Sequence, residues 1–145
     1  MLDVKQTDEL TPAELVSIMA ERTAVFVVEQ NCPYQEVDTD DYDALHVRLM
    51  EDGVMHAYGR IIQADDGIHF GRILVPKAFR HQGQAKKLIE SILEVIKERF
   101  PNQPVLIQAQ AYLVNFYQEF GFQPISGIYL EDGIPHLDMR LDWGN

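Results

Sequence analysis

A polar, glycine-bearing loop that follows a short apolar run is the stretch of this sequence best suited to bind a ligand. The run is Ile73-Leu74-Val75, and the loop reads Arg80-His81-Gln82-Gly83-Gln84-Ala85-Lys86. Gly83 and Ala85 are small enough for a ligand to approach the backbone closely. If a helix begins here, its first N–H groups and the positive end of its dipole form a site for an anion such as pyrophosphate. The alternative is an ordinary solvated helix N-terminus.

The segment after this loop has the periodicity of an amphipathic helix. Apolar residues recur at offsets of 3, 4, 7 and 11 along Ile89, Ile92, Leu93, Ile96 and Phe100. One face of the helix is therefore predicted to be buried. The next apolar run, Val105-Leu106-Ile107, reads as a strand that lies parallel to the one before the loop, as in a strand-helix-strand unit.

The remaining elements predict a sheet of mixed direction. Thr11-Pro12-Ala13-Glu14 has the residue types of a helix start, but valines leave open whether that helix persists through residues 25–29. Asp-Gly turns at 52–53 and 66–67 favour an antiparallel meander. Strands are predicted at residues 3–6, 46–50, 54–64, 68–75, 105–107, 123–130 and 135–142, and a last helix at 111–120 before Gly121. The order indicates an α+β fold with a mixed, mostly antiparallel central sheet of about seven strands flanked by helices.

Length and charge limit the classes of function. A chain of 145 residues is predicted to form one domain, residues 1–145, with a real core. The formal net charge is −11, and acidic residues concentrate between Glu36 and Asp43. This balance argues against nucleic acid or an anionic membrane as a partner and favours cationic small molecules. The acidic cluster is either a solvated loop or a rim that attracts substrate.

Cysteine and histidine usage predicts neither a disulfide nor a metal. The single cysteine, Cys32, has no internal partner, and the sequence opens without a charged-then-apolar leader, so we expect a reducing, cytoplasmic setting. No apolar run approaches the length needed to cross a membrane. The five histidines show no metal-ligand spacing, so we predict no metal cofactor.

Two motifs in this element order resemble the GNAT superfamily of N-acetyltransferases. Arg80, Gly83 and Ala85 match the fixed positions of its pyrophosphate loop, although His81 stands where a second glycine is frequent. Tyr117-Gln118-Glu119-Phe120-Gly121-Phe122 matches the Tyr-x-x-x-Gly-Phe of its penultimate helix. Residues 25–35 (VFVVEQNCPYQ) and 132–136 (DGIPH) resemble the ElaA-like branch. The resemblance spans nearly the whole chain and implies a three-layer α/β arrangement.

The resemblance implies an acetyl-CoA-dependent N-acetyltransferase. The backbone of the loop from Arg80 to Lys86 would bind the pyrophosphate, and Ile73, Leu74 and Val75 would pair with the amides of the pantetheine arm in a slot where the next strand splays away. A backbone N–H near Val75 would polarise the thioester carbonyl. Gln110 stands where the family often has an asparagine that holds the pantetheine arm. We predict that Gln110 makes this contact with its longer side chain, which carries the same amide.

Proton transfer needs an acid and a base. Tyr117 is the candidate acid, because a phenol with a pKa near 10 stays protonated at neutral pH; the alternative is a core aromatic. Glu29 and His136 are the candidate bases, and Asp38, Asp40 and Asp41 are further options. Ordinary surface or polar roles remain open for Glu29 and His136.

The predicted partner is a small amine or a peptide amine, and the resemblance makes a homodimer plausible. Cys32 is not predicted to be a nucleophile, because lone cysteines are usually buried small hydrophobes and the family transfers the acyl group directly. The alternative function is a non-catalytic acyl-CoA-binding sensor of the same fold. A nucleotide-phosphate binder is disfavoured, since the loop lacks both the Gly-Lys-Ser/Thr and the three-glycine patterns.

Overall fold

The computed structural model describes residues 1–143, which build one eight-stranded sheet. The strands run in the order β1-β2-β3-β4-β5-β8-β6, and β7 pairs with β8. Their bounds are β1 Leu2–Gln6, β2 Leu45–Glu51, β3 Val54–Ala64, β4 Gly67–Leu74, β5 Val105–Gln110, β6 Gln123–Pro124, β7 Tyr129–Glu131 and β8 Ile134–Leu141. All pairings are antiparallel except that of β4 with β5. The predicted fold class is therefore confirmed.

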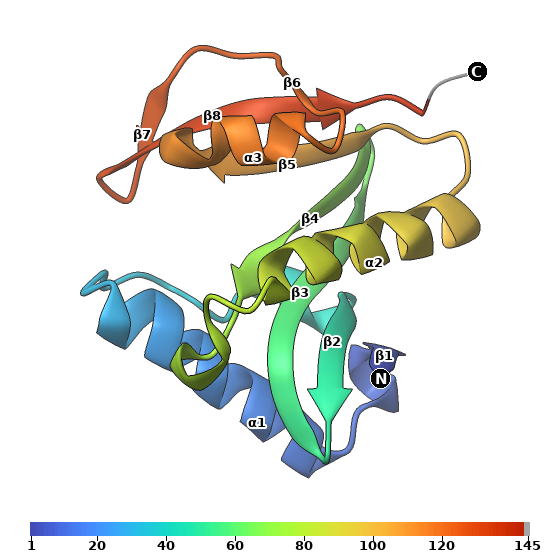
Figure 1. Ribbon diagram of the computed structural model, residues 1–145, viewed down its shortest axis with the longest axis vertical. Coiled ribbons are helices and arrows are strands. Elements are labelled where there is room, and N and C mark those ends of the chain that lie inside the picture. Colours follow the sequence, from blue (N-terminus) through green and yellow to red (C-terminus); the bar gives the residue numbers. More distant parts are fainter. Residues whose placement is uncertain (144–145) are drawn as a thin grey trace.

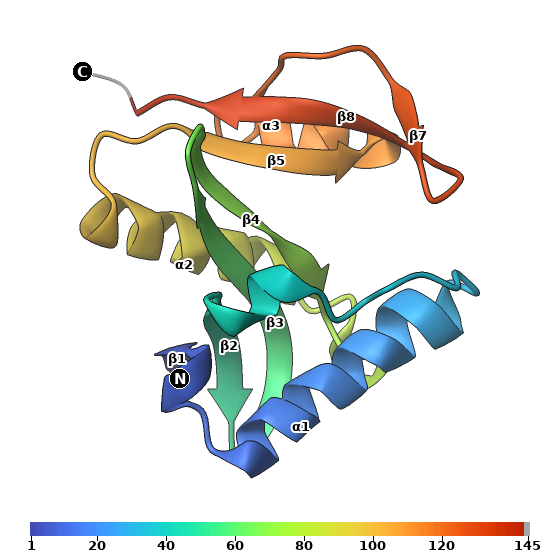
Figure 2. The ribbon, with the colours of Figure 1, turned by 180° about the vertical axis from the view of Figure 1, so that it is seen from behind.

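Helices cover both faces of the sheet. They are α1 (Pro12–Arg22), α2 (Gln84–Arg99) and α3 (Val114–Gln118). Helices α2 and α3 lie on the face turned to the viewer in Figure 1, and α1 lies on the other face, as the reverse view in Figure 2 shows. The apolar stripe of α2 (Leu88, Ile89, Ile92, Val95, Ile96) is buried against the sheet. Among the residues that the structure describes, no helix is both long and apolar enough to cross a membrane.

The start of α1 follows the sequence closely. Thr11 Oγ1 accepts a hydrogen bond from the Glu14 N–H (3.1 Å), and Glu14 Oε1 accepts one from the Thr11 N–H (2.9 Å). This reciprocal capping box confirms the predicted start. The helix does persist beyond α1, but as a wider π-helical segment, η2 (Thr23–Glu29), before Asn31 turns the chain with a φ of 49°.

The parallel strands β4 and β5 meet over only a short length. Ile68 pairs with Val105 and His69 with Leu106, after which the two strands diverge (Figure 1). A bulge in β4 lies in the diverging part, because Arg72 and Ile73 together oppose the single residue Gly59 of β3. A Cβ atom on Gly59 would come within 2.7 Å of Ile73 Cδ1 and of Ile92 Cδ1, so glycine is required where α2 presses on the bulge.

Two predicted elements near the C-terminus are shorter than expected. The helix predicted at 111–120 consists of a 3₁₀ turn, η5 (Ala111–Leu113), followed by the five residues of α3, and Gly121 ends it with a φ of 99°. The strand predicted at 123–130 splits into β6 and β7. Between them, Ser126 Oγ accepts the Asp138 N–H (2.9 Å), so a side chain replaces a main-chain acceptor there. This split accounts for eight strands where about seven were predicted.

Candidate active site

A cleft of about 620 Å³ opens where β4 and β5 diverge. Its walls come from seven parts of the chain: the bulged end of β4, the second half of β5, the α3 region, the segment 26–40, the β7–β8 turn, Arg60 of β3 and Ala85 in the first turn of α2. The predicted site residues on its lining are Ile73, Leu74, Val75, Ala85, Gln110, Tyr117 and His136. Glu29, Arg80, His81, Gln82, Gly83, Gln84 and Lys86 are not part of that lining. The structure thus brings together the predicted slot, the candidate acid and one candidate base.

Within residues 1–143, no side chain caps the first main-chain N–H groups of α2, which begins beside this cleft. Gly83 occupies the N-cap position with a φ of 74° and has no side chain to cap the helix. The Lys87 N–H is the group that bonds back to Gly83 O (3.2 Å), so the preceding N–H groups have no turn of helix behind them. Ala85, in this first turn, lines the cleft. The local geometry suits an anion, as the sequence predicts.

Arg80 is held by the protein itself. Its Nε donates to Val75 O (2.8 Å), and its two terminal nitrogens donate to Glu29 Oε2 (2.6 Å) and Oε1 (2.9 Å). This hydrogen bonding to Arg80 lowers the pKa of Glu29. Arg80 therefore joins the end of β4 to the end of η2, and both of these candidate residues are paired with each other.

Tyr117 is buried among aromatic rings at the cleft. Its side chain is 7% exposed, and its ring contacts those of Phe70, Phe116 and Phe122 at centroid distances of 6.4, 5.2 and 6.0 Å. Burial raises its pKa to about 12. The phenol therefore stays protonated well above neutral pH, and its ring is part of the core. Its role as an acid stays a prediction.

His136 also lines the cleft, from β8, where it is the register partner of Gln110 on β5. Its Nδ1 is 2.7 Å from Ile134 O, which accepts a hydrogen bond when Nδ1 carries the proton. That tautomer leaves Nε2 with its lone pair. The ring stacks on Tyr129 at 6.3 Å, and the carboxylate of Glu131 lies 3.8 Å from Nε2.

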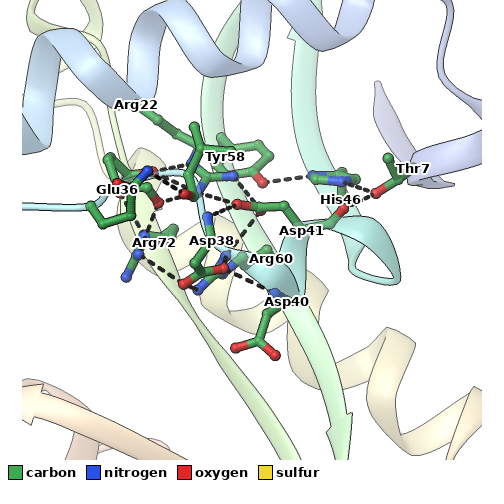
Figure 3. Close-up of polar contacts among 12 residues, drawn as sticks. Thr7, Arg22, Glu36, Asp38, Asp40, Asp41, His46, Tyr58, Arg60 and Arg72 are labelled. Carbon is green, nitrogen blue, oxygen red and sulfur yellow. Dashed lines mark hydrogen bonds and ion pairs between the residues drawn. The ribbon is translucent and has the colours of Figure 1, made fainter.

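Three acidic residues of the loop, Glu36, Asp38 and Asp41, take part in a closed ring of ion pairs (Figure 3), whereas Asp40 and Asp43 are exposed. Three arginines alternate with three carboxylates in the order Arg22, Asp41, Arg60, Asp38, Arg72, Glu36 and back to Arg22. We call this set the ionic ring. Asp41 and Glu36 are each only 5% exposed, so the solvated-loop interpretation is wrong for both.

The ionic ring is electrically balanced. Burial opposes ionisation of Asp41, yet hydrogen bonds and charge from Arg22 and Arg60 outweigh it and lower the pKa to about 2. Hydrogen bonding to Arg60 likewise lowers the pKa of Asp38. Burial works against the charge of Arg22, but its acidic partners raise its pKa overall. Asp38 and Asp41 are thus ionised and engaged, which makes them poor candidates for a base.

A neutral hydrogen-bond chain continues from the ionic ring into the sheet. Thr7 Oγ1 donates to Asp41 O (2.5 Å) and lies 2.8 Å from His46 Nε2, and His46 Nδ1 lies 2.6 Å from the Tyr58 hydroxyl. Burial lowers the pKa of His46 to about 4, so the imidazole is neutral near pH 7. These distances fit a Tyr58 hydroxyl that donates to Nδ1 and an Nε2–H that donates to Thr7.

Sequence reasoning missed several residues of the cleft. Tyr34, Cys32, Gln30 and Phe26 line its wall, as do Arg60 and Arg72. The signal available was arginine inside strand-forming stretches, where an unpaired charge is too costly to bury. No cluster of three or more histidine, cysteine or acidic side chains with the geometry of a metal site occurs within residues 1–143.

Comparisons with known proteins agree with this geometry. Residues 7–143 match the sequence model of the acetyltransferase (GNAT) domain. Protein ElaA of Escherichia coli (strain K12) is 43% identical over 139 residues, which cover 92% of this chain and 91% of that protein. The crystal structure of E. coli ElaA superposes with a TM-score of 0.93 at 38% identity in the structural alignment, over 98% of this chain and 99% of that one.

Two further solved structures share the fold. An acyl-CoA N-acyltransferase from Pseudomonas aeruginosa has a TM-score of 0.93 and 38% identity, over 97% of this chain and 98% of that one. A CoA-dependent acyl-homoserine lactone synthase, solved with SAM and isopentyl-CoA, has a TM-score of 0.82 over 98% of this chain and 82% of that one, but its 15% identity shows the fold alone.

Together, the splayed strands, the uncapped helix start and these likenesses define an acyltransferase enzyme. The chain belongs to the GNAT acetyltransferase family, and it is similar to ElaA over nearly its whole length. The predicted family and branch are confirmed.

Proposed function

We propose that this acyltransferase is an N-acetyltransferase that moves an acetyl group directly from acetyl-CoA to a small amine or a peptide amine. The observation that carries the proposal is the cleft at the divergence of β4 and β5, which has unpaired helix N–H groups at one end and the Tyr117 phenol in its wall. An open strand edge, an anion site and a proton donor are what transfer from a CoA thioester requires.

The first turn of α2 would hold the pyrophosphate. The N–H groups from Gln82 to Lys86 supply donors, and the left-handed Gly83 lets the chain enter the helix without a capping side chain. The β4 edge at Ile73–Val75 would pair with the pantetheine amides, and Gln110 on the facing wall offers an amide for the same arm. Arg80 would act mainly by fixing the loop, because its guanidinium already bonds Val75 and Glu29.

The chemistry needs one proton to leave the amine and one to reach the sulfur. The amine nitrogen attacks the thioester carbonyl carbon, a C–N bond forms and the C–S bond breaks. Tyr117 would protonate the departing thiolate, and its raised pKa keeps that proton available at neutral pH. A main-chain N–H near Val75 would stabilise the negative charge on the carbonyl oxygen.

His136 is the base that the geometry favours. It lines the cleft, and a bond from its Nδ1 to Ile134 O leaves Nε2 free to accept the amine proton directly or through water. Glu29 stays the second candidate; its lowered pKa and its pairing with Arg80 make it the weaker base.

The acceptor is proposed to be cationic apart from its reacting nitrogen. Asp40, Glu131 and Asp132 add carboxylates to the cleft, whereas its arginines are neutralised inside the ionic ring. The formal net charge of −11 acts in the same direction and disfavours nucleic acid and anionic membranes. A cytoplasmic location, a single domain over residues 1–145 and a homodimer remain predictions.

Thiol release from acetyl-CoA in the presence of separate amines tests the function. The panel contains polyamines, amino acids and lysine-containing peptides, with longer acyl-CoA thioesters as a second arm. Turnover with a cationic amine and acetyl-CoA supports the proposal. Tight CoA binding without turnover on any amine would instead favour the acyl-CoA sensor, and turnover only with longer thioesters would contradict acetyl specificity.

A further inference from the structure

Arg72 has an unusual backbone for its side chain. It lies within the β4 bulge and has a φ of 53°, in the left-handed region that residues with a Cβ usually avoid. Glycine would adopt this conformation without that cost, and Gly71 stands directly before it without a positive φ. The sequence therefore retains arginine at the one bulge position where glycine would relieve strain. An outlier of this kind points to a role for the side chain.

The Arg72 side chain connects the bulge to the acidic loop. Its Nη2 donates to Glu36 O (3.0 Å) and lies 3.3 Å from Asp38 Oδ2, and its Nε lies 2.6 Å from Glu36 Oε1. The guanidinium also lies over the Tyr34 ring, 5.5 Å from its centroid. Tyr34 in turn donates its hydroxyl to Glu36 Oε1 (2.7 Å). One arginine thus fixes both the path of the loop and the orientation of Tyr34.

These contacts join β4 to the segment 32–38, which lies on the face of the sheet that carries α1, whereas the start of α2 lies on the other face (Figures 1 and 2). We call the α1 face of the cleft its acceptor side, because the pyrophosphate would occupy the α2 face. Gly71–Val75, which include the bulge, form the β4 wall, and Cys32, Tyr34 and Asp38 of the segment 32–38 line the same cleft. The remaining members of the ionic ring, Arg22, Asp41 and Arg60, lie deeper and are buried. Arg72 is less buried than these and is the member of the ring that belongs to the bulged strand (Figure 3).

We propose that Arg72 is a positioning residue for acyl transfer: bonded to Glu36 and Asp38, it fixes the β4 bulge against the segment 32–38 and so sets the acceptor side of the cleft. This assignment rests on the proposed function, because it concerns the approach of the amine. Arg72 does not act on the reacting atoms. Its effect passes through the β4 backbone and through Tyr34, whereas the pyrophosphate site at the start of α2 is separate.

The decisive variant is Arg72→Gly, because glycine keeps the left-handed backbone and removes only the side-chain contacts. We expect kcat/KM for the amine to fall about 10- to 100-fold, the usual consequence of a reactant misplaced by about an ångström. CoA affinity measured by calorimetry should fall much less, because the helix N-terminus that binds the anion is unchanged and only the pairing of the pantetheine arm with Ile73–Val75 is loosened. Such a split between acceptor and cofactor is not expected from a general loss of stability.

Arg48→Gln is the matched control. Arg48 is also a buried arginine in this sheet, bonded to Asp3 and Glu14, but it is not part of the cleft lining. Its loss should lower thermal stability and leave kcat/KM for the amine unchanged. If Arg72→Gly does not fold, Arg72→Lys, which keeps the charge but not the planar fork, is judged by the same split.

Amide hydrogen exchange of residues 71–75 separates this assignment from the proposed function. Faster exchange there in Arg72→Gly than in Arg48→Gln supports the anchoring role even if the wild-type protein acetylates none of the amines, a result that would count against the proposed function only. Wild-type exchange at 71–75 in a folded Arg72 variant overturns the inference. Wild-type kcat/KM for the amine, or an equal loss of CoA affinity, also overturns it.

Discussion

The ionic ring and the start of α2, two regions that border the cleft, differ in how their polar groups are satisfied. In the ionic ring, three arginines and three carboxylates are paired with one another, and four of the six, Arg22, Glu36, Asp41 and Arg60, are buried. At the start of α2, by contrast, the helix begins at a glycine without a side-chain cap, and its first N–H groups face outward from an exposed loop. The first region satisfies its polar groups internally, while the second leaves them for a ligand.

This difference indicates that the start of α2 serves ligand binding and that the ionic ring serves the rigidity of the fold. Helix α1 of the same chain begins with a complete capping box, so the absence of a capping side chain is specific to the start of α2 in this comparison. Conversely, the carboxylates with the most conspicuous sequence signal, those of the acidic loop, are mostly engaged in structure. If this contrast is correct, changes in the ionic ring should affect stability and acceptor geometry, and changes at the α2 start should affect cofactor affinity.

The largest expected effect concerns Tyr117, the proposed acid in the cleft wall. Tyr117→Phe should lower turnover by roughly 10²–10⁴-fold, because it removes one proton-transfer group and preserves the ring that packs in the core. Steady-state kinetics with acetyl-CoA and an active amine check this. Tyr42→Phe, at an exposed tyrosine off the cleft, is the control. Full activity of Tyr117→Phe would remove the assigned role.

Breaking the ionic ring at its most buried member should cost stability. Arg22→Met leaves Glu36 and Asp41 as buried carboxylates without their main partner, and we expect the free energy of unfolding to fall by about 3–5 kcal/mol. Chemical denaturation measures it. Arg48→Met, whose partners Asp3 and Glu14 are more exposed, should lose less. Equal losses would mean that the closed ring adds nothing beyond an ordinary ion pair.

The buried imidazole beside the ionic ring predicts a pH dependence of stability. Because burial lowers the pKa of folded His46 from 6.5 to about 4, the fold binds its proton less readily than the unfolded chain does. The resulting stabilisation is complete above pH 6.5 and is lost as the pH falls towards 4, with a slope of up to about 1.4 kcal/mol per pH unit. Chemical denaturation at a series of pH values measures this, and the free energy of unfolding of a His46→Gln variant should fall less between pH 6.5 and 4 than that of the wild-type protein. Equal pH profiles of the two proteins would show that His46 is not responsible.

At the α2 start, Gly83→Ala should weaken CoA binding. The φ of 74° strains alanine by about 1–2 kcal/mol, and escape from that strain turns the N–H groups away from the anion. Calorimetric titration with CoA should show about a five- to thirtyfold loss of affinity. Gly53→Ala is closely matched, since Gly53 has a φ of 75° and equally open space in the β2–β3 turn. Unchanged CoA affinity in Gly83→Ala, or equal losses in both variants, would refute the contrast between the two regions.

The smallest effect is expected for Glu29→Gln. Its carboxylate has a lowered pKa and serves Arg80, so kcat should change by less than about threefold, whereas His136→Gln should lower it by about 10²-fold or more. The pH dependence of kcat/KM for both variants provides the check. A severe loss in Glu29→Gln with a normal His136→Gln would reverse the assignment of the base.

Local signals in the sequence predicted much of this fold. The Thr11–Glu14 box fixes the start of α1, the spacing from Ile89 to Phe100 fixes the buried face of α2, and Asp-Gly turns join the meander. Each of these depends on residues close together in the chain. The break between β6 and β7 was not predictable in the same way, because the Ser126–Asp138 bond that accompanies it joins different strands.

The candidate site likewise contains parts that local motifs predict and parts that depend on contacts between distant elements. The loop, the slot on β4 and Tyr117 follow from motifs, but the ionic ring joins Arg22, the loop residues 36–41, Arg60 and Arg72 from separate elements. Arginines within two predicted strands, Arg60 and Arg72, were the available clue, and pairing them with particular carboxylates required the register of β3 and β4. The pairing of Arg80 with Glu29 was hidden for the same reason, since 51 positions separate the two residues.

Calorimetric titration of the wild-type protein with acetyl-CoA, beside S-acetylpantetheine, which lacks the pyrophosphate, tests the central claim most directly. We predict saturable binding of one acetyl-CoA per chain, and an affinity for S-acetylpantetheine that is weaker by at least about tenfold, because the donors at the α2 start then have no anion to bind. No heat with acetyl-CoA, or equal affinity for the two compounds, would contradict the account.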